Sequence, residues 1–222
     1  MRFQDAAPDA RAVTYAAIQA DPVVARAAAL LAPASSTQRL LARAVMNGET
    51  IDAEAWRTMF PTLFGAAAET ELRESSEAVL AVSLAIADRG DQSRSQLRGA
   101  VVESLTAELL ARRVGTAAIR RERRILFDGV PAEIHPYDVT VERAGAAEAY
   151  DCKWAARGIN ADVLYQLDDA RTNAQAEGEA LHVALVVFDA ARSCRVRLGQ
   201  QTAPHGSTHL VPLEALDGLA SR

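Results

Sequence analysis

The sequence predicts an α/β fold with a mixed central sheet, preceded by an all-helical region. Three observations support this prediction. Residues 1–90 carry repeated helix start and stop signals, and residues 92–113 place apolar side chains every four positions, which is typical of a helix. Residues 181–188, with the sequence LHVALVVF, form a continuous apolar run of the kind found in strands that are buried on both faces.

Residues 1–90 are expected to form a helical N-terminal region. The first helix is expected to break at Asp21-Pro22. Ser35-Ser36 and Asp52 are suited to begin helices, because their side chains can accept hydrogen bonds from free backbone N–H groups. Asn47-Gly48 is a typical helix stop. The region has no basic helix face, so we expect it to contact a partner protein, or a second copy in a homodimer, rather than to read DNA.

Residues 91–222 are expected to form one α/β domain with elements in the order α-β-β-β-α-β. In chain order, the predicted elements cover residues 92–113, 117–127, 133–141, 148–154, 161–176 and 181–188, with a weaker strand at 195–198.

Lys153 is the only lysine of the chain, although the sequence contains 24 lysine and arginine residues. It lies in the stretch AYDCKWA, within a predicted strand. If Ala144 and Gly145 form a two-residue hairpin loop, the register of the flanking strands places Asp138 directly opposite Asp151. The sequence therefore predicts two neighbouring carboxylates with a lysine beside them.

Strand alternation divides these two strands into a core face and a chemical face. The core face is predicted to carry Tyr137, Val139, Val141, Tyr150, Cys152 and Trp154, and the chemical face Asp138, Thr140, Asp151 and Lys153. Two adjacent carboxylates repel each other unless a cation lies between them, and oxygen ligands select magnesium or manganese. Beside such an ion, a lysine can orient or deprotonate a water, whereas an arginine cannot give up its proton.

These residues resemble the motifs of the PD-(D/E)xK nuclease superfamily over about residues 92–190. Pro136-Tyr137-Asp138 is similar to the first motif, with one extra residue between proline and aspartate, and Asp151-Cys152-Lys153 is similar to the second. Glu103 matches the acidic residue that many members carry on the first core helix. Gln166 matches a glutamine that some members place on the helix after the lysine strand.

The resemblance implies a restriction-endonuclease-like core and a magnesium-dependent phosphodiesterase, a deoxyribonuclease. It implies that Asp138, Asp151, the Cys152 carbonyl and Glu103 hold Mg²⁺ or Mn²⁺, that Lys153 positions the nucleophile, and that Gln166 belongs to the site. Glu108, about 140° around the same helix, is the alternative to Glu103. Gly99, one turn before Glu103, is expected to let the helix approach the sheet.

Arginines are the candidates for DNA binding. The net charge of −5 argues against a protein that grips nucleic acid with its whole surface. Arg120, Arg121, Arg123 and Arg124, with Arg157, are expected to form a local phosphate-binding wall. The alternative for the run at 120–124 is an edge strand whose charges oppose aggregation.

By analogy with the superfamily, a restriction or anti-phage defence role is expected. Two alternatives stay open: a catalytically inactive structural or regulatory subunit with the same fold, and a structure-selective or RNA-directed nuclease. The sequence shows no signal peptide and no long apolar run, so we expect a cytoplasmic protein without membrane contact.

Overall fold

The computed structural model of the chain describes residues 1–6, 10–48, 50–131, 135–143, 145–203 and 208–221. The chain divides into two units. The helical unit is Ala10–Glu108, and the α/β unit combines Met1–Asp9 with Leu109–Arg222. No described helix has the length and apolarity that crossing a bilayer requires.

The boundary between the units lies within one long helix, α7 (Asp91–Val114), whereas the sequence predicted it at residue 90. The first part of α7 is bonded within the helical unit, where Arg94 donates to the Gly48 carbonyl at 3.2 Å. Its last turn is bonded within the α/β unit, where Arg113 donates to the Leu219 carbonyl at 3.1 Å. The composition changes near residue 90, but the contacts change only two turns before the helix ends.

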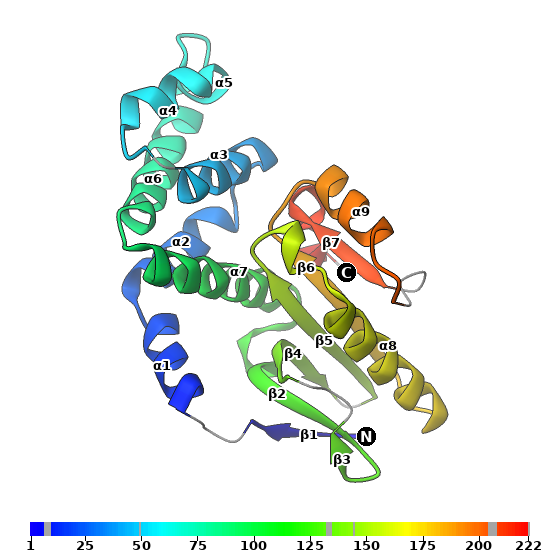
Figure 1. Ribbon diagram of the computed structural model, residues 1–222. Helices are drawn as coiled ribbons and strands as arrows, with labels where there is room; N and C mark the ends of the chain where they lie inside the picture. The colour runs from blue at the N-terminus through cyan, green and yellow to red at the C-terminus, as the bar shows by residue number, and fades with distance from the viewer. Residues whose placement is uncertain (7–9, 49, 132–134, 144, 204–207, 222) are drawn as a thin grey trace. The chain divides into compact units, whose positions relative to one another are not determined.

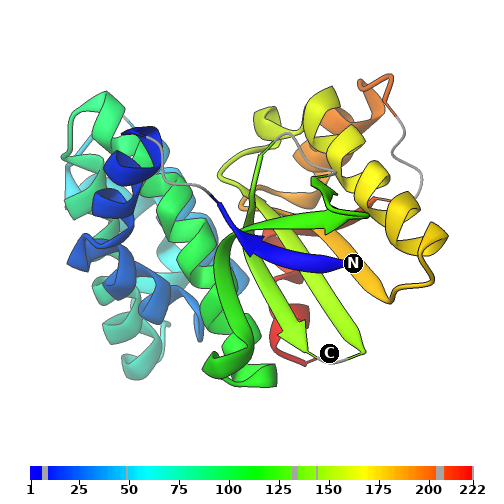
Figure 2. The ribbon, with the colours of Figure 1, turned by 90° about the horizontal axis from the view of Figure 1, so that it is seen from below.

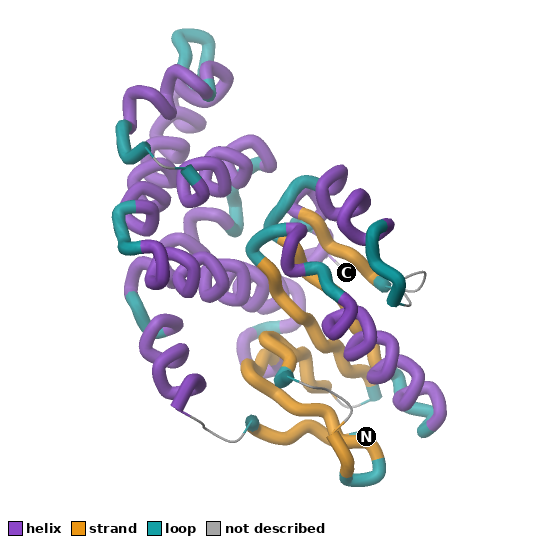
Figure 3. Tube along the Cα trace, in the orientation of Figure 1, coloured by secondary structure: helices purple, strands orange, loops and turns teal. Residues whose placement is uncertain are grey.

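The helical unit consists of α-helices joined by short loops throughout its described residues (Figure 3). They are α1 (Ala10–Gln19), α2 (Pro22–Leu31), α3 (Ser36–Asn47), α4 (Ala53–Met59), α5 (Pro61–Phe64), α6 (Thr70–Ala87) and the first part of α7. The predicted helix starts are confirmed. Ser35 accepts a hydrogen bond from the Gln38 N–H at 3.3 Å, and Asp52 accepts one from the Glu54 N–H at 2.9 Å.

The α/β unit is built on a mixed open sheet, so the predicted α/β class with a mixed sheet is confirmed. Its strands are β1 (Arg2–Asp5), β2 (Ile119–Phe127), β3 (Val130–Pro131), β4 (Tyr137–Arg143), β5 (Ala146–Lys153), β6 (Leu181–Val187) and β7 (His209–Pro212). The strand order is β1-β2-β4-β5-β6-β7, with β3 paired to the end of β2. The pairs from β1 to β5 are antiparallel, and β5, β6 and β7 run parallel.

Helix α8 (Ala161–Ala176) packs against one face of this sheet (Figure 1). It connects the parallel strands β5 and β6, as a crossover helix does. The apolar cluster beneath it includes Leu164 and Leu167 of α8 and Val183 and Leu185 of β6. The sheet face on the α8 side is therefore a core face.

Two edge strands and one helix differ from the predicted elements. β1 was not predicted, because four mostly exposed residues carry no strand pattern; it pairs with β2 from the other end of the sequence (Figure 2). The strand predicted at 195–198 is wrong, since these residues belong to helix α9 (Ala191–Gly199). The strand on that side of the sheet is β7, which follows ten residues later.

Candidate active site

The β4–β5 hairpin has the register that the sequence predicted. Val139 pairs with Tyr150, and the same register continued by one position places Asp138 opposite Asp151. The backbone N–H of Cys152 donates to Oδ2 of Asp138 at 2.5 Å. The carboxylate of Asp138 therefore lies against the β5 backbone between Asp151 and Lys153.

The Lys153 ammonium forms an ion pair with Oδ1 of Asp151. The two side chains are 28% and 7% exposed, so the pair is largely shielded from water. Burial by itself lowers the pKa of Lys153, but the charges of Asp151 and Asp138 raise it by more, and the pKa lies above the ordinary value of lysine. Lys153 is held as a cation, which suits orienting a water or stabilising negative charge better than deprotonating a water.

The face that carries Asp151 and Lys153 was predicted to be a chemical face opposite the core, but it is also a core face. In the parallel pair of β5 and β6, Asp151 lies next to Leu185 and Lys153 next to Val187. Both apolar neighbours belong to the cluster that α8 covers. Parallel strands are commonly covered on both faces, because each crossover helix packs onto the sheet. Asp151 and Lys153 therefore lie beside the apolar cluster that α8 covers.

Tyr137 also departs from the predicted alternation. It was predicted to share the core face with Val139, on the side opposite Asp151. Instead it packs in the α8 cluster together with the neighbours of Asp151, and its hydroxyl donates to the Gln166 carbonyl at 3.3 Å. The regular alternation is interrupted beside Asp138, where Glu122 on the neighbouring strand β2 has a left-handed φ of 51°. A local irregularity of this kind redirects side chains near a strand end.

Gln166, a predicted site residue, forms hydrogen bonds with the segment that leads into β4. Its side chain is buried, and its amide Nε2 donates to the His135 carbonyl at 3.1 Å while Oε1 accepts from the His135 N–H at 3.2 Å. His135 lies three residues before Asp138. Both ends of the Gln166 amide are thus bonded to backbone, and the residue positions the strand that carries the first carboxylate.

Glu103 lies in the helical unit, where α1 binds both of its carboxylate oxygens. The Tyr15 hydroxyl donates to Oε1 at 2.5 Å, and the Gln19 amide donates to Oε2 at 2.8 Å. Gly99 makes room for this contact, because a β-carbon at that position would lie 3.0 Å from the Tyr15 hydroxyl oxygen. The glycine thus admits a tyrosine from α1. The alternative residue, Glu108, is exposed.

Arg123, a predicted DNA-binding residue, is neutralised within the sheet. Its guanidinium forms ion pairs with Asp5 of β1 and, at 2.7 Å, with Glu142 of β4. These contacts join three neighbouring strands. Arg123 therefore has a structural role in the described sheet, and its charge is largely compensated.

The other candidate arginines are more accessible. Arg120 is exposed on β2 and donates to two nearby backbone carbonyls, each at 2.8 Å. Arg121 and Arg124 are partly exposed. Arg157 is exposed on η2 (Ala156–Gly158), the turn directly after the strand of Lys153. Arg120 and Arg157 are the members of the predicted wall best placed to meet a ligand in solution.

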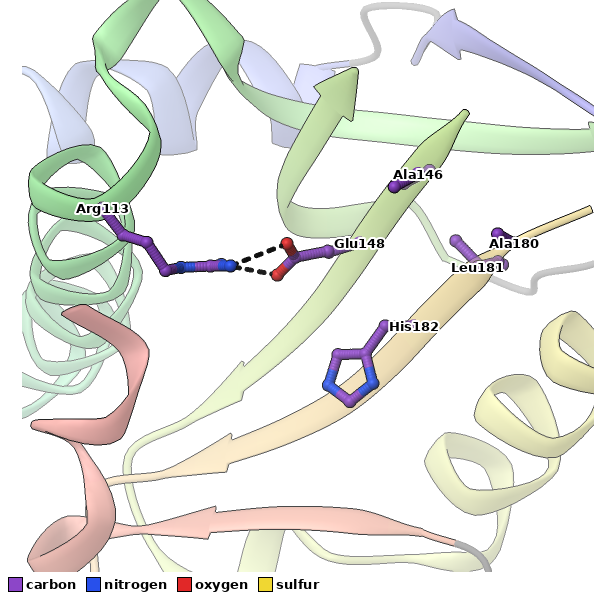
Figure 4. Close-up of a pocket in the computed structure, with 7 residues that line it drawn as sticks. Arg113, Ala146, Glu148, Ala180, Leu181 and His182 are labelled. Atoms are coloured by element: carbon purple, nitrogen blue, oxygen red, sulfur yellow. Dashed lines mark hydrogen bonds and ion pairs between the residues drawn. The ribbon is translucent and has the colours of Figure 1, made fainter. Parts of the chain in front are cut away.

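A polar cluster that the sequence did not predict surrounds Glu148 (Figure 4). Arg113 donates to both carboxylate oxygens, at 3.0 and 2.6 Å, and the Tyr150 hydroxyl and Arg143 also donate to them. Arg113, Glu148 and His182 line a shallow pocket of about 440 Å³ at the starts of β5 and β6. Because the carboxylate accepts four hydrogen bonds, the cluster ties the end of α7 to the sheet.

The spacing of Glu148 and Tyr150 is the sequence signal that could have indicated this cluster. Residues two apart on a strand point to the same face, so a glutamate and a tyrosine at that spacing can bond to each other. The partner Arg113 is 35 positions away and has no local signal.

Asp138 and Asp151, together with the backbone carbonyl of Cys152, are oxygen donors of the kind that Mg²⁺ and Mn²⁺ prefer. Mg²⁺ often binds through one or two carboxylates and keeps several waters, so this pair fits such an ion without a third protein side chain. Across the described part of the chain, no three His, Cys, Asp or Glu side chains are grouped to hold a metal. The donors suit a partly hydrated ion at the edge of the hairpin.

Comparison of the chain with protein-family models, with curated proteins and with solved structures found no match. The function is therefore argued from the residues and their geometry.

Proposed function

We propose that the chain is a metal-dependent nuclease of the PD-(D/E)xK type, which hydrolyses phosphodiester bonds in DNA with Mg²⁺ or Mn²⁺ bound by Asp138 and Asp151. The observation that carries the proposal is the β4–β5 register, which brings the Asp138 carboxylate to the Cys152 N–H, beside the Asp151–Lys153 ion pair. The order α7, β2, β4, β5, α8 and β6 supports it, since it matches the α-β-β-β-α-β order of the restriction-endonuclease-like core.

Each residue of the site has a role in the proposed reaction. A bound divalent cation would lower the pKa of its water and polarise the phosphate. Asp138 and Asp151 hold this charge in place. Lys153, an ammonium beside Asp151, orients the attacking water and offsets the negative charge that develops on the phosphate. Gln166 keeps the strand of Asp138 in position through the backbone of His135.

The helical unit is proposed to contact a partner protein or a second copy of the chain. Leu40, Ile51 and Met59 of that unit are exposed large apolar side chains, which support a contact surface. A role in restriction or anti-phage defence and a cytoplasmic location belong to this proposal by analogy with the superfamily.

A cleavage assay with the variant Lys153→Arg tests the proposal. This substitution keeps the positive charge beside Asp151 but replaces a compact ammonium with a planar guanidinium. The substrates are linear duplex DNA, supercoiled plasmid, single-stranded DNA and RNA, each with Mg²⁺, Mn²⁺ or a chelator. We expect metal-dependent cutting by the wild type and a loss of about 100-fold in Lys153→Arg, because displacing a positioning group by about 1 Å can cost that much in rate.

The matched control is Arg171→Lys, which makes the opposite exchange in a surface ion pair of α8 with Asp168. It should cut like the wild type. Equal activity of Lys153→Arg and the wild type, or cutting that persists in chelator, would contradict the proposal. Cutting of RNA alone would favour the RNA-directed alternative, and cutting of a branched duplex alone, added as a fifth substrate, would favour the structure-selective one.

A second candidate function is a catalytically inactive structural or regulatory subunit. The observation that favours it is that Glu103 is bonded at both oxygens by Tyr15 and Gln19, while Asp151 is already paired with Lys153. Calorimetric titration with Mn²⁺ separates the two candidates. Absence of both metal binding and cleavage would favour the inactive subunit, and metal binding lost in Asp138→Asn would favour the nuclease.

A further inference from the structure

The turn that follows β5 folds back onto the side chain of Lys153. A β-carbon at Gly158 would lie 3.0 Å from each of Cβ, Cγ and Cδ of Lys153. That distance is shorter than nearly all real contacts of a β-carbon, so the lysine stem occupies the space that any side chain at position 158 would need. Three consecutive stem carbons thus lie along the bare backbone of one glycine.

Asp189 holds the start of this turn from the end of β6. It is buried, with an exposed fraction of 4%, and its Oδ2 accepts from the Ala156 N–H at 3.0 Å. Its other oxygen, Oδ1, accepts from the Ala190 N–H at 2.7 Å. One buried carboxylate therefore links the turn after Lys153 to the loop after the neighbouring parallel strand.

Further contacts fix both ends of the turn. The Phe188 N–H donates to the Lys153 carbonyl at 2.9 Å, and the Phe188 ring stacks on Trp154 with centroids 5.1 Å apart. At the far end, Nε of Arg197 on α9 donates to the Ile159 carbonyl at 3.0 Å. Contacts at Lys153, Ala156 and Ile159 therefore hold the turn on both sides of Gly158.

A free lysine side chain samples many rotamers, and restraining it costs conformational entropy. In this protein the stem lies against Gly158, and the ammonium is bound by Asp151 at the other end. A fixed turn therefore removes much of that freedom before any ligand binds. Placing a charged group in advance is the main way in which a site avoids reorganisation during reaction.

We propose that Gly158 and Asp189 are positioning residues for Lys153. Gly158 provides the flat surface for the lysine stem, and Asp189 holds the turn that carries Gly158. The consequence for cleavage rests on the nuclease function proposed above, whereas the placement of the ammonium is a property of the fold.

Nuclear magnetic resonance of the single lysine tests this proposal. Because Lys153 is the only lysine, selective ¹³C-lysine labelling gives the signals of one side chain. We expect a restrained Cε group in the wild type. In Gly158→Ala and Asp189→Asn, its chemical shift should move and its motion should increase. Gly158 lies outside the left-handed region of φ, so alanine suits the backbone and the test does not depend on the buried Asp189 variant folding.

The control is Glu214→Gln, which alters an exposed carboxylate that accepts from the Ala191 N–H at 2.9 Å, close to Asp189 in the chain. It should leave the lysine signal unchanged. In cleavage assays, Gly158→Ala should lower kcat by about 10- to 100-fold with KM for DNA unchanged, because a displacement of about 1 Å can cost about 100-fold in rate.

The outcomes separate this inference from the nuclease proposal. An unchanged lysine signal in both variants overturns the positioning role, whatever the cleavage results. A lysine signal that moves in both variants and not in the control supports it, even if the wild type cuts no substrate; in that case only the nuclease function is refuted. Loss of kcat together with the moved signal supports both.

Discussion

Replacing Lys153 with methionine should create an uncompensated pair of carboxylates in the folded protein. Methionine keeps an unbranched stem that can lie along Gly158, so the change removes mainly the charge. Asp151 is 5% exposed and has Lys153 as its ion-pair partner, and Asp138 lies within the range of the same charge. The variant therefore isolates the electrostatic contribution of the ammonium.

The expected destabilisation at pH 7 is about 3 kcal/mol. Breaking a buried ion pair by removing one partner costs about 3–5 kcal/mol, and the 28% exposure of the lysine side chain favours the lower end. Mn²⁺ should restore most of this loss, because a ligand at about 100 times its Kd stabilises the folded state by about 2.7 kcal/mol.

The pH dependence of the loss follows from the pKa of Lys153. Burial lowers this pKa, but the charges of Asp151 and Asp138 raise it by more, so the folded pKa lies above the unfolded value. The stabilisation that Lys153 provides is therefore complete below the unfolded pKa of about 10.4 and is lost as pH rises through the folded pKa, so the difference between wild type and variant should not change across neutral pH.

Urea denaturation at pH 4 to 8, with and without Mn²⁺, measures these effects. Trp154 reports on the α/β unit, and a Trp56→Phe background removes the signal of a tryptophan in the helical unit. Arg171→Met, in the same background, removes a cation from a surface pair and should cost less than about 1 kcal/mol at any pH. Wild-type stability of Lys153→Met at pH 7, with no response to Mn²⁺, would refute the reasoning.

Three further predictions concern the surroundings of the site. Glu148→Gln should cost about 3–5 kcal/mol in urea denaturation at pH 7, because Arg113 loses its counter-charge. Burial raises the pKa of Glu148, but hydrogen bonds to its carboxylate, chiefly from Arg113, lower this pKa by more. The stabilisation that Glu148 provides is therefore lost as pH falls through its folded pKa. The stabilities of the variant and the wild type should converge below about pH 4. Arg120→Ala with Arg157→Ala should weaken DNA binding and reduce the slope of log K against log salt by about one per arginine, and an unchanged slope would dismiss the basic wall. Gln166→Leu should cost about 1–3 kcal/mol and weaken Mn²⁺ binding in calorimetry, whereas a purely local packing role would leave the affinity unchanged.

The hairpin could be predicted because its determinants are local. Gly145 has φ of 77°, a left-handed conformation that glycine adopts readily, and the strands on either side alternate clearly. A single turn residue and the two-residue period of a strand are enough to define which residues are paired. The neighbourhood of Asp138 and Asp151 follows from that register.

Elements that depend on distant partners could not be predicted in the same way. Arg195 to Leu198 alternates basic and apolar residues like a strand, yet it is helical, with Cys194 buried, Val196 57% exposed and Arg197 bonded to the Ile159 carbonyl. A segment of four residues is too short to show whether its apolar residues repeat with the period of a helix or of a strand. The helical choice depends on contacts with a turn nearly 40 positions earlier.

Glu103 and Gly99 show a related limit of sequence reasoning. Glu103 was predicted to assist a metal and Gly99 to let the helix approach the sheet, but the side chain that approaches both positions is Tyr15 on α1, 88 positions before Glu103. A buried carboxylate and a glycine one turn apart predict that something approaches the helix closely. They carry no information about which element does so.

The choice of lysine at position 153 follows from how the two types of cation bind a carboxylate. Arg113 binds both oxygens of Glu148 with its planar guanidinium and, together with Tyr150, leaves that carboxylate saturated. Lys153 is paired with Asp151 through Oδ1, as a point charge on a slender stem. An arginine at position 153 would bind both carboxylate oxygens of Asp151 and so compete with a metal ion for them. Its planar guanidinium is also wider than an ammonium and would not lie along Gly158 in the same way. If Asp151 holds a metal as proposed, a lysine compensates its charge while leaving an oxygen for the ion.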